Sequence, residues 1–540
     1  MNHALRFLSA LMLAPLAMAL CPERVAAAAP PATDPICIDV GRQLFVDDFL
    51  IAETELERTY HPAALHVSNP VLQPATPLEM NVIRGRDALP VAAPFGDGAW
   101  FDATDGLFKM WYHAGWFDGI GYATSKDGIR WERPSLDGAT GTNRVLPPRE
   151  EGGCTMMRDA VSVWHDASSE DAAARWKMFV FSRLDGRPEG ESHGELFASP
   201  DGVRWTTLRP VGFWHGDNTS IFHDPFRGQW VLSVRERAPS LHDPVRSVRA
   251  RFIHTAADFS KLGERPGRQR APLWMKLDAR DRPDLDLGYE PELYHFTATP
   301  YESLMVGVFG IFYGPPNEVC AKARRPKIID LQLGYSRDGF VYDRPHRAAF
   351  LKCARAPGAW NRGYLHPATG VCLIVGDRLY FYFGAWSGTG AGREHMYAGG
   401  NTGLATLRRD GFASMDAVET PGTVTTVPIV FHGRHPFVNV ATENGELRAE
   451  VLDAEGRVIP PFSRDRAIPV RVDSTRQRLA WEGADDLSAV AGKPARLRFH
   501  VSNGSLYAFW VTPDPNGASY GYVAAGGPGL GWPTDRPKGQ

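Results

Sequence analysis

Three acidic residues at the starts of expected strands are the chain's candidates for catalysis: Asp159, Asp217 and Glu292. Cleavage of a glycosidic bond needs a protonated carboxylic acid for the leaving oxygen and an ionised carboxylate for a water molecule or the anomeric carbon. Leu293 and Tyr294 follow Glu292, and apolar neighbours favour a protonated carboxyl group, so we expect Glu292 to be the acid. Asp159 or Asp217 would be the base or nucleophile and the other an orienting group, unless these carboxylates only cap strand ends.

A second group of residues is expected to bind substrate: Arg158, Glu290, Glu302, Trp386 and Asp48. Arg158 could bind a sugar hydroxyl or carboxylate, or pair with the adjacent aspartate. Trp386 stands in a glycine-rich segment, where its indole ring could stack on a sugar. Glu302 is a rival acid in the same repeat unit as Glu290. Asp48 belongs to an Asp-Asp pair that either caps the site or forms a hairpin turn.

No pattern in the chain indicates a metal or cofactor. The 17 histidines are scattered, there is no HExxH motif, and the cysteines lack the spacing of a zinc site. Residues 388–392 (GTGAG) look like a dinucleotide loop, but no helix is expected after them. We therefore expect no cofactor and no metal. Cys320 and Cys353 could form a disulfide or be isolated buried thiols.

A repeated turn indicates which elements position the acids. Residues 125–131 (SKDGIRW) and 199–205 (SPDGVRW) are nearly identical, and residues 336–340 and 409–412 keep the Asp-Gly pair. Asp-Gly favours a tight turn between two strands, and one hairpin recurring in successive units is typical of a β-propeller. We predict an all-β chain: a five-bladed β-propeller followed by a C-terminal β-sandwich. The first strands of the blades begin around a central channel, so acids there would converge.

The expected organisation has five parts. They are a signal peptide at 1–29, N-terminal lead-in strands at 30–68, the catalytic propeller at 69–420, the β-sandwich at 427–525 and a loose C-terminal tail at 526–540. The leader has Arg6 before an apolar run over 7–20 and small residues at 26–29, which predicts export to the periplasm or the exterior.

The net charge and the hydropathy of the chain limit the classes of partner that we expect it to bind. The 540 residues include 59 Lys and Arg and 62 Asp and Glu, a net charge of -3, which gives no electrostatic reason to expect nucleic acid. The apolar leader is short for a membrane span, and no later segment qualifies. We expect a carbohydrate partner, no nucleic acid and no membrane span, with the oligomeric state open.

Over residues 69–417 the chain resembles the five-bladed propeller glycosidases of the invertase and arabinanase superfamily. The resemblance is carried by residues 69–74 (NPVLQP), by the Arg-Asp pair at 158–159 and by residues 106–112 (GLFKMWY), which resemble exported bacterial invertase-like proteins of unassigned substrate. It implies an exported glycoside hydrolase acting on poly- or oligosaccharides. The chain lacks the Trp-x-Asn-Asp-Pro motif and the Glu-Cys pair of the invertase group.

Three alternatives stay open at this point. The first is a carbohydrate-binding propeller without catalysis. The second is a sialidase-like enzyme, because the Ser-x-Asp-Gly turns resemble the Asp-box of sialidases. The third is a polysaccharide lyase that uses a tyrosine or histidine as its base. The sequence leaves the sugar, the linkage and the stereochemical outcome undetermined.

Overall fold

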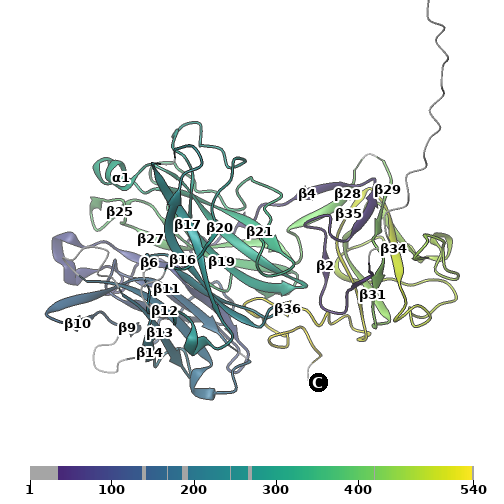
Figure 1. Ribbon diagram of the computed structural model, residues 1–540, viewed down its shortest axis with the longest axis horizontal. Helices are drawn as coiled ribbons and strands as arrows, with labels where there is room; N and C mark the ends of the chain where they lie inside the picture. Colours follow the sequence, from purple (N-terminus) through teal and green to yellow (C-terminus); the bar gives the residue numbers. More distant parts are fainter. Residues whose placement is uncertain are drawn as a thin grey trace, which may run out of the picture. The chain divides into compact units, whose positions relative to one another are not determined.

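The structure, a computed structural model, describes residues 34–537 except 137–141, 167, 185–192, 214, 244, 265–269 and 419. The expected signal peptide lies outside the described residues. Pro35–Gln540 form one compact unit. Strands dominate it, and the described part contains a single short α-helix, α1 (Asn317–Ala323) (Figure 1). The predicted all-β class is confirmed.

Between Val91 and Arg408 the chain forms five successive antiparallel units. The first contains β6 (Val91–Asp102), β7 (Leu107–Ala114), β8 (Ile120–Ser125) and β9 (Arg144–Leu146). The second contains β10 (Arg149–Glu151), β11 (Cys154–His165), β12 (Trp176–Leu184), β13 (His193–Ser199) and β14 (Thr206–Pro210). The third contains β15 (Ser220–Asp224), β16 (Gln229–Pro239), β17 (Ser247–Ala256) and β18 (Leu273–Met275).

The last two units complete the propeller part. The fourth contains β19 (Glu292–Glu302), β20 (Leu304–Gly314) and β21 (Ile328–Ser336), with β36 (Tyr522–Val523) at its edge. The fifth contains β22 (Gly363–Pro367), β23 (Leu373–Val375), β24 (Arg378–Trp386), β27 (Gly400–Arg408) and β5 (Ala64–Leu65). Strand β27 also pairs with β6 in parallel, so the first and fifth units share one sheet. Because these two units form a single sheet, the five units do not correspond to five separate sheets, and the number of blades stays a prediction.

The repeated turn is built by its own side chains. Ser125 Oγ accepts from the N–H of Gly128 at 2.9 Å, and Asp127 Oδ1 accepts from the N–H of Ile129 at 2.9 Å. The copy at residues 199–205 forms the same bonds. There Gly202 has φ +78°, which glycine tolerates, and its carbonyl accepts from Trp111 Nε1 of the first unit at 2.7 Å. The motif thus both closes a hairpin and docks one unit on another.

Two six-stranded sheets form the sandwich. One contains β1 (Ile36–Cys37), β3 (Ile51–Thr54), β29 (Gly422–Thr426), β30 (Ile429–Val430), β32 (Glu446–Asp453) and β34 (Ala495–Ser502). The other contains β2 (Gln43–Leu44), β4 (Glu57–Tyr60), β28 (Ala413–Ala417), β31 (His435–Ala441), β33 (Asp473–Arg478) and β35 (Gly504–Thr512). Phe45, Phe499 and Phe509 lie in the core between them. The lead-in strands β1 to β4 are thus part of the sandwich sheets.

The short elements and the chain end complete the fold. The remaining elements are β25 (Thr389–Gly390), β26 (Arg393–Glu394) and the 3-10 helices Val82–Asp87, Ala172–Ala174, Phe259–Lys261 and Arg464–Arg466. The expected loose tail is anchored in its described part, because Trp532 packs on Trp100 and His165 at ring distances of 5.9 and 5.5 Å. Cys320 and Cys353 are buried free thiols, so no disulfide joins them.

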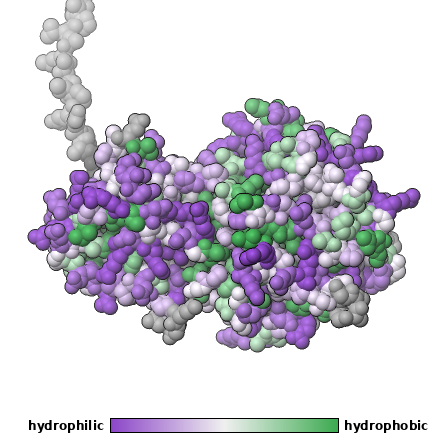
Figure 2. Space-filling model, turned by 180° about the vertical axis from the view of Figure 1, so that it is seen from behind, coloured by the Kyte–Doolittle hydropathy of each residue, from purple (hydrophilic) through white to green (hydrophobic). Residues whose placement is uncertain are grey.

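None of the helices described here is long and apolar enough to cross a bilayer. On the face shown in Figure 2, apolar residues are scattered among hydrophilic ones.

Candidate functional site

One cavity of 390 Å³ collects side chains from all five antiparallel units. Its cationic residues are Arg183, Arg235, Arg237, Arg249 and Lys327, and its acidic residues are Asp159 and Asp217. Its remaining lining residues are Phe95, Trp116, Phe117, Tyr294, Asn317, Tyr364 and Tyr397. If the short edge strand β10 is left out, the first strands of the units contact one another, β6 with β11 and β22, and β15 with β11 and β19. The cavity therefore lies where the first strands converge.

β-bulges aim four side chains into this cavity. The pairing register shifts in β6 between Ala93 and Gly98, in β11 between Arg158 and Val161, in β19 between Leu293 and His295, and in β22 between Gly363 and His366. Each interval holds one lining residue: Phe95, Asp159, Tyr294 and Tyr364, respectively. Bulges turn a side chain away from the regular alternation of a strand and are frequent beside active sites. The same distortion in four different units indicates a built site.

The two predicted aspartates meet at one guanidinium. Arg183, on β12, bonds through Nε to Asp159 Oδ2 and through Nη2 to Asp217 Oδ2, the latter at 2.8 Å. Arg235, on β16, donates from Nε to Asp217 Oδ1 at 2.8 Å. The structure thus brings together side chains from the second and third units.

Arginines keep Asp217 ionised. Burial raises the pKa of Asp217, but the guanidiniums of Arg235 and Arg183 outweigh burial and hold its pKa well below the usual range. The adjacent Asn218 has φ +57°, and the lining residues Phe117 and Tyr364 have φ +64° and +59°. Left-handed backbone at residues other than glycine is costly and concentrates at functional sites. Strained backbone thus lies beside Asp217, whose ionised carboxylate is available as a base or a nucleophile.

Lys327 is a buried cation in the wall of the cavity. It is 2% exposed, and its Nζ donates to the hydroxyl of Tyr294 at 3.0 Å. The ring centroids of Tyr364, Tyr294 and Tyr397 lie 4.7, 5.0 and 5.5 Å from this nitrogen. A cation–π contact contributes about 0.5–2 kcal/mol, whereas removing an ammonium group from water costs several kcal/mol. The tyrosine rings offset part of that cost.

Glu292 lies next to the cavity but does not line it. Its carboxylate accepts from Arg249 Nη1 at 2.6 Å and from the N–H of Arg249 at 3.1 Å, and Arg237 and Arg246 lie 3.9 Å away. The expectation of apolar surroundings for Glu292 is therefore wrong, because Arg249 of β17 bonds to its carboxylate and two further arginines lie nearby. Glu290 accepts from Ser240 Oγ at 2.8 Å and also lies outside the cavity lining. Glu292 therefore contacts Arg249, which in turn lines the cavity.

The other expected binding residues lie elsewhere. Arg158 is buried and donates to Ser182 Oγ at 2.9 Å, with Glu195 at 3.4 Å, rather than pairing with its neighbouring aspartate. Trp386 is fully buried, with its ring against Tyr364 behind the cavity wall, so it offers no platform to a sugar. Asp48 is exposed and pairs with Arg58.

Glu302 belongs to a buried network that joins the propeller to the sandwich. It accepts from the N–H of Arg42 and from Arg409 Nη2, both at 3.1 Å, and from Ser519 Oγ at 2.7 Å. Arg42 in turn bonds to Asp410 at 2.7 Å. Burial raises the pKa of Glu302, although Arg42 and Arg409 act against this effect. These contacts describe a structural cluster.

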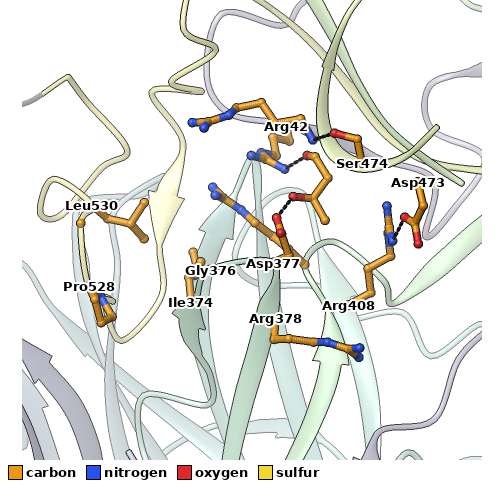
Figure 3. A pocket seen from close by; sticks show the side chains of 14 residues that line it. Arg42, Ile374, Gly376, Asp377, Arg378, Arg408, Asp473, Ser474, Pro528 and Leu530 are labelled. Atoms are coloured by element: carbon orange, nitrogen blue, oxygen red, sulfur yellow. Dashed lines mark hydrogen bonds and ion pairs between the residues drawn. The ribbon is translucent and has the colours of Figure 1, made fainter. Parts of the chain in front are cut away.

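A larger cavity of 710 Å³ borders this network (Figure 3). It lies between β24 and β27 of the propeller and β33 of the sandwich. Its walls are formed by arginine, aspartate and small or aliphatic residues, and Arg408 is bonded there to Asp473. None of the described residues that line it is aromatic. Sugar rings bind against aromatic faces. The 390 Å³ cavity, which has aromatic lining residues, is therefore the better candidate for a saccharide site, although it is the smaller of the two.

Sequence reasoning missed the basic and tyrosine residues of the site. One signal was present: arginines alternate at 235 and 237 and again at 249 and 251, the period of a strand with one charged face. No comparable pattern marks Lys327 or the tyrosines. Within the described residues no group of three or more His, Cys, Asp or Glu side chains could hold a metal ion.

Comparison with known proteins gives structural neighbours only. No family model and no curated protein matches the chain. Similar solved structures include a protein from Bacteroides ovatus described as a glycoside hydrolase (16% identity, 64% of this chain and 97% of that chain, TM-score 0.39). They also include a fructofuranosidase from Schwanniomyces occidentalis (11%, 81% and 98%, 0.35) and an exo-β-1,3-galactanase from Phanerochaete chrysosporium (10%, 84% and 99%, 0.35). The function is argued below from the residues of this chain.

Proposed function

We propose that the protein is an exported glycoside hydrolase that cleaves poly- or oligosaccharides in the cavity lined by Asp159 and Asp217. The observation that carries the proposal is the meeting of these two carboxylates, from successive units, on the guanidinium of Arg183. Hydrolysis of a glycosidic bond requires two carboxyl groups, one that gives a proton to the leaving oxygen and one that is ionised. Export rests on the apolar run and small residues of the first 29 positions.

The residues divide the chemistry between them. Asp217, held ionised by Arg235 and Arg183, acts as base or nucleophile. Asp159, which Arg183 binds, is the second carboxyl group, and in this proposal it takes up a proton and gives it to the leaving oxygen as the general acid. Trp116 and Tyr397 stack on each other, with ring centroids 4.3 Å apart, and give the cavity an aromatic wall against which a sugar can pack. Glu292 positions Arg249.

A second candidate function is a polysaccharide lyase. It is favoured by the hydrogen-bonded chain from Lys327 Nζ to Tyr294 Oη and on to Tyr364 Oη, at 3.0 and 2.9 Å. A tyrosine hydroxyl beside a cation can take part in proton abstraction, and nearby guanidiniums can stabilise the charge that develops on a uronate. A lyase releases an unsaturated product that absorbs in the ultraviolet, whereas a hydrolase releases a new reducing end without that absorbance.

The test is a glycan screen followed by single substitutions. Asp159→Asn and Asp217→Asn keep the size of each side chain, and each should lower kcat/KM about 100-fold or more on the substrate found. Asp48→Asn is the matched control, because Asp48 is an exposed aspartate away from the cavity. Full activity of both site variants would refute the proposal. Saccharide binding without any turnover by the unmodified protein would instead indicate a binding propeller.

A further inference from the structure

Four arginines share one face of the hairpin β16–β17. In the antiparallel register Arg235 lies opposite Arg251, and Arg237 lies opposite Arg249. Like charges directly opposite each other in a sheet repel, so such a cluster needs negative partners. Asp217 and Glu292 are the acidic partners described above for Arg235 and Arg249. The hairpin therefore carries more positive charge than these acids neutralise.

Arg251 is the most deeply buried arginine of the hairpin. It is fully buried, and its guanidinium donates to the backbone carbonyls of Asn218 and Tyr294 rather than to a carboxylate. Burial, with the neighbouring Arg235, lowers the pKa of Arg251 to about 9. A positive field of this kind attracts anions into the adjoining space.

Lys327 adds a further positive charge from another unit. Its ammonium group has three donor hydrogens, and the Tyr294 hydroxyl is its one hydrogen-bond acceptor among the described residues. No carboxylate of the described chain lies within 4.0 Å of it. An ammonium that is 2% exposed and lines a cavity is therefore ready to donate to a ligand.

The charge balance of the cavity decides the class of ligand. Five cations and two carboxylates line it, an excess of three positive charges. Glu292 and Arg251, just behind the wall, add one charge of each sign and leave that excess unchanged. We propose that the cavity binds an anionic group of its ligand, a carboxylate, sulfate or phosphate, through Lys327 and the arginines of β16 and β17. This inference rests on the proposed function in taking that group to be a substituent of the saccharide substrate.

The test is equilibrium binding by isothermal titration calorimetry with four kinds of probe. These are galacturonate, galactose 6-sulfate, neutral galactose and inorganic phosphate. At least one anionic probe should bind about tenfold tighter than galactose, because a charge-assisted hydrogen bond is worth roughly that factor. The carboxylate, sulfate and phosphate arms identify which anion the site prefers, and competition between the sugars and phosphate tests whether they share one site.

Substitutions assign the binding to the cavity. Lys327→Met removes the charge and should weaken the best anionic probe about tenfold, while galactose binding changes little. Lys322→Met makes the same change at an exposed position of α1 and should have no effect. Arg237→Gln, at a side chain that is 43% exposed, repeats the test should Lys327→Met fail to fold. Equal affinities for charged and neutral probes, or unchanged anion binding in both site variants, would overturn the inference.

The binding test and the activity test of the proposed function can fail independently of each other, because binding needs no turnover. Anion binding that depends on Lys327, without cleavage of any saccharide, would uphold the anion site and refute the hydrolase. Cleavage of a neutral saccharide that depends on Asp159 and Asp217, without preferential anion binding, would do the reverse.

Discussion

Asp159 and Asp217 bind to two different nitrogens, Nε and Nη2, of one guanidinium, that of Arg183. The two aspartates come from different antiparallel units, so the arginine fixes both the distance and the orientation between carboxylates that are far apart in the sequence. A guanidinium presents several donors in a rigid fork and suits this bridging role better than an ammonium group. The bridge also shields two negative charges from each other in a buried position.

Arg235 sets the pH range of Asp217. Since the guanidiniums of Arg235 and Arg183 hold the pKa of Asp217 well below its usual range, Asp217 stays ionised in mildly acidic solution. Arg235→Gln removes one of these charges and should raise that pKa, which moves the acidic limb of the kcat/KM profile to higher pH. The measurement is the pH dependence of kcat/KM on the screened substrate. Arg130→Gln, at an exposed arginine, should leave the profile in place.

Tyr294→Phe separates hydrolase from lyase. The substitution removes the hydroxyl that accepts from Lys327 and keeps the ring. A hydrolase that relies on the carboxylates should lose less than about tenfold in kcat/KM. An enzyme in which this hydroxyl transfers the proton should lose roughly 100-fold or more. A large loss together with an unsaturated product would contradict the hydrolase in favour of the lyase.

Asp97 should make stability fall as pH rises. Burial raises the pKa of Asp97 to about 7, and its Oδ1 accepts from the N–H of Phe95, a residue of the cavity wall. Asp97 ionises at lower pH in the unfolded chain than in the folded one, so its contribution to stability is greatest below about pH 4 and decreases as the pH rises to about 7. The difference corresponds to about 4 kcal/mol.

Asp97→Asn should remove this dependence, because the amide oxygen can still accept from Phe95 and no charge is buried. We expect the variant to be more stable than the unmodified protein at pH 8 and similar to it at pH 4, as measured by urea unfolding. If the variant is equally destabilised at both pH values, the packing of the Asp97 side chain matters for stability, and the cost of burying its ionised carboxylate does not.

Arg42→Met should destabilise the protein without touching the proposed site. Arg42 is fully buried against Asp410 and Glu302, with its guanidinium 4.2 Å from the ring centroid of Trp510. Removing one partner of a buried ionic cluster costs about 3–5 kcal/mol. Urea unfolding should show this loss, while the affinity of the folded protein for its ligand stays unchanged. Arg457→Met, at an exposed ion pair, should have little effect on unfolding.

Part of this architecture follows from local sequence patterns. The Asp-Gly turns form the hairpins that their residues predict, because Ser125 and Asp127 bond to backbone N–H groups within the same turn. Asp159 and Asp217 come together because both lie at or near the first strand of a unit, and those strands converge.

The rest depends on contacts between units. Glu292 looked like a carboxyl group among apolar residues, but Arg249 on the neighbouring sheet lies beside it. Trp386 stands in a glycine-rich segment, yet the closure of the fifth unit on the first buries it. The bulges that turn Tyr294 and Tyr364 into the cavity leave no clear mark in composition or periodicity. Such features arise only when distant strands are assembled.

The most direct test of the catalytic site is a crystal structure of Asp217→Asn with the oligosaccharide that the screen identifies. The account predicts the sugar against Trp116 and Tyr397, with the scissile oxygen within hydrogen-bonding distance of a side chain at 159 or 217. An oligosaccharide bound instead in the larger cavity beside Arg42 and Arg408, with the cavity lined by Asp159 and Asp217 empty, would contradict the account.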